Sequence, residues 1–248
     1  MHIAPELATA LRLAKSVAVL TGAGVSAESG VPTFRDSQTG LWSKFRPEDL
    51  ATPEAFLRNP AMVWEWYVSR RERLSGIEPN AGHVALAGIE RRMPQFTLAT
   101  QNVDGLHRRA GSRNIIELHG NILRTKCFDA GHRVQALPDD TRVPPRCPLC
   151  DSMLRPDVVW FGEMLPLGAI EQASDAARSC DLFLNVGTSA VVYPAAELPE
   201  LARQSGAIVV EVNPDPSAVA DFADFTLAAP SGVALPALVG AAWGQTQE

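Results

Sequence analysis

The chain alternates short, mostly apolar runs with stretches in which apolar residues recur at helical spacing. Short apolar runs bounded by turn residues are typical of strands that are buried on both faces of a parallel sheet. The five strongest runs are residues 17–20, 96–100, 115–118, 182–186 and 208–212, and helical patterns over residues 170–178 and 195–204 precede the last two. This order predicts an α/β fold with a doubly wound, Rossmann-like parallel sheet.

Two long segments interrupt the alternation. Residues 37–92 are rich in Trp, Pro and Arg and contain a strong helical pattern over residues 61–74, whereas residues 123–156 hold three of the four cysteines. We predict that a helical insertion (37–92) and a zinc-ribbon-like insertion (123–156) together form a smaller subdomain. The main domain then consists of residues 1–36, 93–122 and 157–248.

Composition excludes several classes of protein. Hydrophobic residues make up 46% of the chain and charged residues 20%, which is ordinary globular composition and excludes disorder as the main state. With 22 Lys and Arg against 28 Asp and Glu, the net charge of -6 provides no basic face for nucleic acid. The sequence has neither a secretory leader pattern nor an apolar run long enough for a membrane span, so we expect a cytoplasmic protein without a membrane partner.

The cysteine spacing indicates a metal site with one irregular ligand. A zinc ribbon takes four ligands from two Cys-x-x-Cys pairs, and Cys147 and Cys150 form one such pair. Cys127 has no cysteine three residues later, so either His132 or Asp129 would supply the fourth ligand of a structural zinc. The alternative is a module without metal that is held together by packing alone.

A glycine-rich turn follows the first predicted strand. Residues 21–27 read TGAGVSA, in which Gly22 and Gly24 permit a tight turn and close backbone approach. The helix that follows is expected to offer unpaired N–H groups to a pyrophosphate. Turns of this kind also occur without a ligand. Moreover, the acidic ribose ligand that a dehydrogenase carries about 20 positions later has no counterpart in residues 40–45.

Several longer motifs make the chain recognisable. Residues 22–36 read GAGVSAESGVPTFRD, and further along the chain come TQNVDGLH (100–107), LHG (118–120), LRPDVVWFGE (154–163) and GTS (187–189). In this order they resemble the sirtuins, a family of NAD-dependent protein deacylases, and especially the desuccinylase-type class III branch and its bacterial relatives.

The resemblance implies a reaction in which NAD and acyl-lysine give nicotinamide, O-acyl-ADP-ribose and free lysine. It places His119 as the general base that takes a proton from a ribose hydroxyl, which suits a side chain whose pKa is normally about 6.5. Asn102 is implied to assist as a second catalytic residue. The remaining NAD contacts implied by the resemblance are Gly22, Ala23, Gly24, Ser26, Phe34, Arg35, Gln101, Asn102, Asp104, Gly187, Thr188, Ser189, Asn213 and Asp215.

One cation lies on an otherwise apolar helical stripe. Val63, Tyr67, Arg70 and Leu74 share one face of the predicted helix, and a buried arginine there requires an anionic partner. Without the family context, Arg70 would be expected to reach water or to pair with a nearby glutamate. By resemblance, Tyr67 and Arg70 recognise the carboxylate of succinyl- or malonyl-lysine.

The segment around residue 160 is implied to bind the acyl-lysine peptide. Val159, Phe161 and Gly162 match the edge along which the peptide of a sirtuin substrate adds as a strand. Asp157 stands where close relatives usually carry histidine, and we expect it to add negative charge near this groove. The partners predicted are therefore acyl-lysine proteins or peptides and NAD. The alternative function is an NAD glycohydrolase or ADP-ribosyltransferase that uses the same cleft and releases nicotinamide without an acyl peptide.

Overall fold

Six parallel strands form the central sheet of the computed structural model, which describes residues 1–32 and 50–244. Across the sheet their order is β3 (Ile115–Glu117), β2 (Gln95–Thr100), β1 (Ser16–Thr21), β7 (Leu182–Val186), β8 (Ile208–Val212) and β9 (Phe225–Leu227). The five predicted strands are confirmed, with ends that differ by at most one residue. The sequence pattern did not indicate β9, because its three residues form too short a run.

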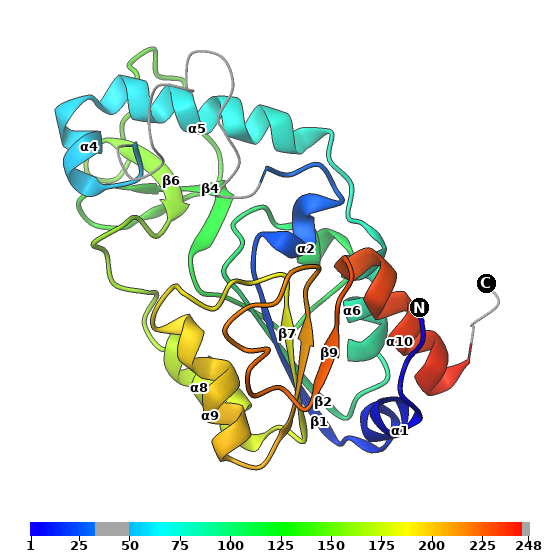
Figure 1. Ribbon diagram of the computed structural model, residues 1–248. Coiled ribbons are helices and arrows are strands. Elements are labelled where there is room, and N and C mark those ends of the chain that lie inside the picture. Colours follow the sequence, from blue (N-terminus) through cyan, green and yellow to red (C-terminus); the bar gives the residue numbers. More distant parts are fainter. Residues whose placement is uncertain (33–49, 245–248) are drawn as a thin grey trace.

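Helices cover both faces of this sheet (Figure 1). On one face lie α1 (Pro5–Leu13), α6 (Ala81–Glu90) and α10 (Ser231–Trp243), and on the other lie α8 (Ala169–Ser179), the short 3-10 helix η2 (Ala195–Glu197) and α9 (Leu198–Gln204). Val17 and Val19 of β1 pack toward the first group, whereas Ala18 and Leu20 pack toward the second. Because alternate side chains point to opposite faces and both faces are covered, the four central residues of the strand are all apolar.

Helix α6 belongs to the main core, although it lies inside the predicted helical insertion of residues 37–92. It packs against α10, and its Leu86 and Ile89 are fully buried beside the parallel sheet. The side chain of Asn80 accepts hydrogen bonds from the amides of Gly82 and His83 and so caps the start of the helix. The insertion boundary at residue 92 therefore needs correction, because the apolar face of α6 covers the sheet.

A second, smaller sheet is antiparallel and lies beside the main domain (Figure 1). Its order is β5 (Arg133–Val134), β4 (Gly120–Cys127) and β6 (Leu154–Val158). Helices α4 (Pro53–Arg58) and α5 (Pro60–Ser75) pack on it, and α5 is the helix predicted over residues 61–74. A core separate from those of the main sheet joins Phe56, Trp66 and Trp160.

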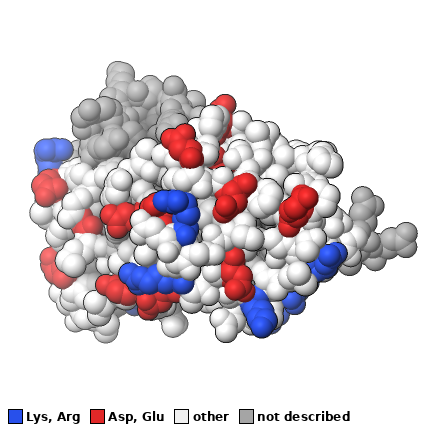
Figure 2. All heavy atoms as spheres, turned by 60° about the horizontal axis from the view of Figure 1, so that its bottom comes forward, with Lys and Arg blue, Asp and Glu red and all other residues white. Residues whose placement is uncertain are grey.

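The surface carries charges of both signs. On the face drawn in Figure 2, acidic and basic side chains are both present and are scattered among uncharged residues. Among the described helices, none has the length and apolarity that a membrane span requires.

Candidate active site

The strand order creates a crevice at the carboxyl ends of β1 and β7. From β1 the chain continues to β2 and β3 on one side and later returns to β7, β8 and β9 on the other, so the strand order reverses between β1 and β7. Ligands of doubly wound sheets bind at such a switch point. The loops at this end contain the predicted residues Gly22, Ala23, Gly24, Ser26, Gln101, Asn102, Asp104, His119, Gly187, Thr188, Ser189, Asn213 and Asp215. Phe34 and Arg35 lie outside the described residues.

The glycines of the first loop allow two loops to interlock. A Cβ on Gly24 would lie 2.8 Å from the Cα of Gly187, and a Cβ on Gly22 would lie 2.7 Å from the Cβ of Thr188. Gly187 has a φ of +59°, and a Cβ there would lie 2.3 Å from the nitrogen of Val25. Glycine is therefore required at these positions for close contact between the loops after β1 and β7.

Most amides of this loop already donate hydrogen bonds within the protein. The helix that follows, α2 (Gly24–Ala27), has only four residues. Its amides do not form the expected set of unpaired N–H groups, because those of Gly22, Gly24, Val25 and Ser26 donate to the carbonyls of Val186, Gly187, Gly22 and Ala23. The Ala23 N–H is partly exposed and has no partner in the described part of the chain.

Buried hydrogen bonds orient the polar residues after β2. The Ser26 hydroxyl donates to Oδ2 of Asp104 at 2.8 Å, and the Asn102 amide group donates to the Gly22 carbonyl at 3.0 Å and to Ser26 Oγ at 3.2 Å. His83, which is fully buried, lies 3.3 Å from the Ser26 hydroxyl. The sequence analysis did not single out His83, because no motif or strand end marks it. Asn102 is thus held with its side-chain nitrogen engaged, and its side-chain oxygen has no hydrogen-bond partner among the described residues.

His119 follows β3 and is oriented by the chain's own backbone. Its Nδ1 lies 3.0 Å from the carbonyl oxygen of Gln101. Because a carbonyl only accepts, Nδ1 carries the proton and Nε2 of the neutral ring has the free lone pair. Burial lowers the pKa of His119 below its ordinary value, although the hydrogen bond to Gln101 raises it. The ring is therefore neutral at pH 7 and suited to accept a proton at Nε2.

Thr188 connects three of the loops. Its hydroxyl accepts a hydrogen bond from the Gln101 side chain at 3.0 Å, and its carbonyl accepts one from the Asn213 side chain at 3.0 Å. Ser189 is partly exposed beside it, and Asp215 is exposed two residues beyond Asn213. These contacts fix the relative positions of the loops after β2, β7 and β8.

Tyr67 and Arg70 lie next to each other on α5, with unequal sets of partners. The Tyr67 hydroxyl accepts a hydrogen bond from Nε1 of Trp160 at 2.9 Å, and burial raises its pKa to about 12. The guanidinium of Arg70 lies 4.8 Å from the centre of the Trp66 ring. Burial lowers the pKa of Arg70, yet within residues 1–32 and 50–244 no carboxylate forms an ion pair with it. The neighbouring Arg71, by contrast, donates to the carbonyls of Ile122 and Arg124.

The predicted peptide edge is attached to the active-site loops. The Val159 N–H donates to the carbonyl of His119 at 2.9 Å, and the Phe161 N–H donates to the carbonyl of Ala51 at 2.9 Å. In the described chain the Val159 carbonyl and the Gly162 N–H have no backbone partner. Phe161 is exposed and Gly162 has a φ of +85°. A strand added here would therefore pair with the Val159 carbonyl and the Gly162 N–H.

Asp157 does not add charge to the groove, contrary to expectation. Its side chain is buried and forms ion pairs with Arg124, Lys126 and Arg133 at 3.0, 3.4 and 3.1 Å. Burial would raise the pKa of Asp157, but these cations hold it below its ordinary value. The carboxylate thus joins β4, β5 and β6, and its charge is neutralised inside the small sheet.

The predicted metal ligands meet in the small domain. The ligand atoms of Cys127, His132, Cys147 and Cys150 all lie within 4.8 Å of one another. The sulfurs of Cys127 and Cys150 are 3.7 Å apart, and two thiolates bound to a tetrahedral zinc at about 2.3 Å are about 3.8 Å apart. The donor set and spacing fit a structural zinc. His132, and not Asp129, lies in this cluster as the fourth potential donor.

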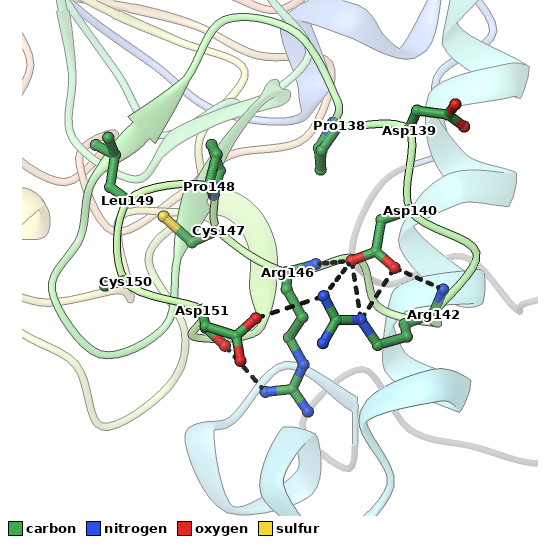
Figure 3. Close-up of a pocket in the computed structure, with 10 residues that line it drawn as sticks. All are labelled: Pro138, Asp139, Asp140, Arg142, Arg146, Cys147, Pro148, Leu149, Cys150 and Asp151. Atoms are coloured by element: carbon green, nitrogen blue, oxygen red, sulfur yellow. Dashed lines mark hydrogen bonds and ion pairs between the residues drawn. The ribbon is translucent and has the colours of Figure 1, made fainter.

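Ion pairs hold the loop around this cluster (Figure 3). Asp140 accepts hydrogen bonds from the amides of Arg142 and Arg146 and from the Arg142 guanidinium, which also contacts Asp151 at 3.4 Å. The bonds from Arg142 keep the pKa of Asp140 well below its usual range. Burial would raise the pKa of the Cys147 thiol, but hydrogen bonds from the Leu149 amide and from His132 lower it to about 7. This thiol is readily deprotonated for metal binding.

Purified protein that has not been exposed to chelators is expected to contain about one equivalent of zinc. Cys150→Ser removes one ligand and should lower the zinc content and the unfolding temperature, because the metal joins β4 to the loop after β5. Elemental analysis and thermal melting provide the measurements. Cys180→Ser is the matched control, since Cys180 lies outside the cluster beside the parallel sheet. A wild-type zinc content below about a tenth of an equivalent contradicts a metal-bound module.

The chain is similar in sequence to proteins of one family. The model of the Sir2 family matches residues 22–194. The NAD-dependent protein deacylase of Ralstonia nicotianae is 53% identical over 237 residues, which cover 95% of this chain and 96% of that protein.

Solved structures agree with the sequence comparisons. A Sir2 homolog in complex with NAD has a TM-score of 0.89 and 44% identity, and the match covers 96% of this chain and 93% of that one. A Sir2 complex with p53 peptide and NAD⁺ has a TM-score of 0.81 and 31% identity, covering 92% and 93% of the two chains. The predicted α/β fold and the resemblance carried by the motifs are confirmed.

Proposed function

Because this chain belongs to the Sir2 family and is an NAD-dependent protein deacylase, we propose that it removes succinyl and malonyl groups from lysine as well as acetyl groups. The products are free lysine, nicotinamide and O-acyl-ADP-ribose. The finer acyl specificity rests on the pocket beside α5, and the roles of individual residues rest on the positions described above.

The observation that carries the proposed specificity is that the guanidinium of Arg70 pairs with no carboxylate of the described residues. It is partly buried, one helical turn from Tyr67, and in the described chain it lies over the face of Trp66 and pairs with no carboxylate. A buried cation is costly without an anion, and a guanidinium together with a phenol matches the two oxygens of a carboxylate. A succinyl or malonyl chain ends in such a carboxylate, and the bound substrate then supplies the missing anion.

In the proposed reaction, His119 takes a proton from a ribose hydroxyl of NAD through Nε2. Its Nδ1–H remains bonded to the Gln101 carbonyl, which keeps the ring in the required orientation and tautomer. The free carbonyl oxygen of Asn102 is placed to accept a hydrogen bond from the ribose or from a water molecule. These two side chains are the proposed catalytic residues.

The proposed NAD contacts follow the loops of the crevice. The Ala23 N–H is available to a pyrophosphate oxygen, and Asp104, oriented by Ser26, is available to the nicotinamide carboxamide. Gln101, Asn213 and the segment 187–189 line the ribose side, with Asp215 at its exposed end. Phe34 and Arg35 are proposed contacts on the grounds of their motif alone. Gly22 and Gly24 contribute by permitting the loops to approach each other.

The peptide that carries the acyl-lysine is proposed to pair with the edge formed by Val159, Phe161 and Gly162. This edge begins next to His119, because the Val159 N–H donates a hydrogen bond to the His119 carbonyl. Backbone pairing recognises the main chain more than the side chains, so a range of protein substrates is expected.

The test uses matched peptides that carry succinyl-, malonyl- or acetyl-lysine at the same position, incubated with and without NAD. Mass spectrometry is expected to show NAD-dependent loss of all three acyl groups and formation of O-acyl-ADP-ribose. Preference for acetyl over both acidic groups would overturn the proposed specificity. If nicotinamide were released at the same rate without any acyl peptide, the chain would act instead as an NAD glycohydrolase or ADP-ribosyltransferase.

A further inference from the structure

The hydroxyl of Tyr67 has its hydrogen-bonding direction set by Trp160. The indole Nε1 lies 2.9 Å from the Tyr67 oxygen, and both side chains are buried. An indole N–H can only donate, so the phenol oxygen is the acceptor in this bond. The phenol's own proton remains, and in the described chain no acceptor takes it. Tyr67 therefore has a hydrogen bond to donate.

An ion pair between a buried arginine and a partly exposed glutamate fixes the Trp160 ring that makes this bond. The Arg155 guanidinium lies 3.3 Å from the centre of the indole ring, and both ends of the guanidinium bond to the carboxylate of Glu163. Glu163 also accepts the backbone N–H of Trp160 at 2.8 Å, and Arg155 donates to the Val158 carbonyl at 2.8 Å. Phe56 packs against the indole with ring centres 5.2 Å apart. The ring therefore has one orientation.

Holding the ring with this ion pair costs free energy, because the charge of Arg155 is removed from water. Arg155 is 2% exposed and the Glu163 side chain 24% exposed, and an ion pair that takes a charge out of water contributes little net stability compared with apolar residues of the same volume. Trp160 is the residue that both partners of the pair contact, and it in turn donates to the Tyr67 hydroxyl. Orienting the hydroxyl is an effect that an apolar substitute for the pair would not provide.

We propose that Trp160 is a specificity-determining positioning residue. Its indole N–H donates a hydrogen bond to the oxygen of Tyr67, so that the phenol O–H is directed to donate a hydrogen bond to the acyl group. This inference rests on the proposed function. It adds that the pocket prefers an acyl chain whose end only accepts hydrogen bonds, as a carboxylate does. Arg155 and Glu163 hold the indole in the plane that this donation requires. The raised pKa of Tyr67, about 12, agrees with a phenol that keeps its proton.

Trp160→Phe removes the N–H and keeps an aromatic ring against Arg155. The readout is the ratio of kcat/KM for succinyl-lysine to kcat/KM for acetyl-lysine on the same peptide. The variant is expected to lower this ratio about five- to tenfold, mainly through KM for the succinyl peptide, because one oriented hydrogen bond is weakened. An equal loss on both peptides, as general loosening of the core would cause, overturns the proposal.

The decisive measurement combines Trp160→Phe with Tyr67→Phe. If Trp160 acts through the phenol, it has nothing to orient once the hydroxyl is gone. The double variant should then have the same succinyl-to-acetyl ratio as Tyr67→Phe alone, within about twofold. Independent, multiplicative losses would contradict the proposal. Trp243→Phe is the matched control, because Trp243 lies on α10 and contacts Arg92.

A second substitution covers the case in which Trp160→Phe does not fold. Replacing Trp160 with benzothienylalanine puts sulfur in the place of the N–H and keeps the size of the indole. It should lower the ratio as Trp160→Phe does, and an unchanged ratio overturns the proposal.

Arg70→Met distinguishes a failure of the role proposed for Trp160 from a failure of the proposed acyl pocket. If that variant loses succinyl activity selectively and the Trp160 variants do not, the role of Trp160 is wrong and the acyl pocket stands; if Arg70→Met is not selective, the pocket itself is wrong.

Discussion

Replacing His119 with alanine is expected to lower kcat/KM for NAD-dependent deacylation about 10²- to 10⁴-fold, for both succinyl and acetyl peptides. The free Nε2 is the only nitrogen of the ring available to accept a proton, because Nδ1 is bonded to the Gln101 carbonyl. Loss of this base affects a step that is common to all acyl groups. Mass spectrometry of the peptide products with and without NAD gives the rates.

The matched control is His2→Ala, since His2 is exposed near the N-terminus and far along the chain from the strand ends. It should retain wild-type activity. A His119→Ala variant that keeps more than about a tenth of the wild-type rate would assign proton transfer to another group.

The pH dependence of the wild-type enzyme tests the same base. Burial lowers the pKa of His119 below the ordinary value of about 6.5, so the ring is neutral and active above that pKa. Activity should fall as the pH decreases through it, which places the acidic limb of kcat/KM below about pH 6.5. Acetyl peptide is the suitable substrate, because its acyl group does not titrate. A limb centred above pH 6.5 would contradict the assignment.

Arg70→Met is expected to lower kcat/KM for desuccinylation about 10- to 100-fold, the effect of losing a charge-assisted contact to a carboxylate. Deacetylation should change by less than about threefold, because an acetyl group does not reach an anion-binding residue. Methionine keeps an unbranched apolar chain that can remain against Trp66. The two rates are measured on peptides that differ only in the acyl group.

Arg73→Met is the matched control for this variant. Arg73 is exposed on the same helix, so the substitution removes the same charge from α5 and leaves the Arg70 side chain in place. It should leave the succinyl-to-acetyl ratio unchanged. If Arg70→Met lowered kcat/KM equally for both substrates, the guanidinium would support the fold of α5 and would not recognise the acyl group.

Some features of this protein are local in sequence and were predicted from it. The strands of the parallel sheet were found because helices on both faces require apolar side chains at successive positions. Helix α5 was found because its apolar residues recur at helical spacing along one face. The loop motifs were found because glycine and polar residues at strand ends occupy short, unbroken stretches.

Other features depend on contacts between distant segments. The sequence left His132 and Asp129 as equal candidates for the fourth ligand, and only the fold of the loop after β4 placed His132 among the thiols. Asp157 was expected to lie near the groove, yet pairing of β6 with β4 and β5 surrounds it with three cations. Helix α6 was assigned to an insertion, because its partner α10 lies at the other end of the chain.

The sequence by itself determined the parallel sheet, the order of the loops at its carboxyl ends and the family to which the chain belongs, because these depend on the type and spacing of neighbouring residues. Only the tertiary structure decided which donor completes the metal cluster, that Arg70 lacks an anion in the described chain, and that Trp160 sets the direction of the Tyr67 hydroxyl. Tyr67 and Trp160 are 93 positions apart. No periodicity or motif records a hydrogen bond over such a separation, because it exists only after two elements have packed.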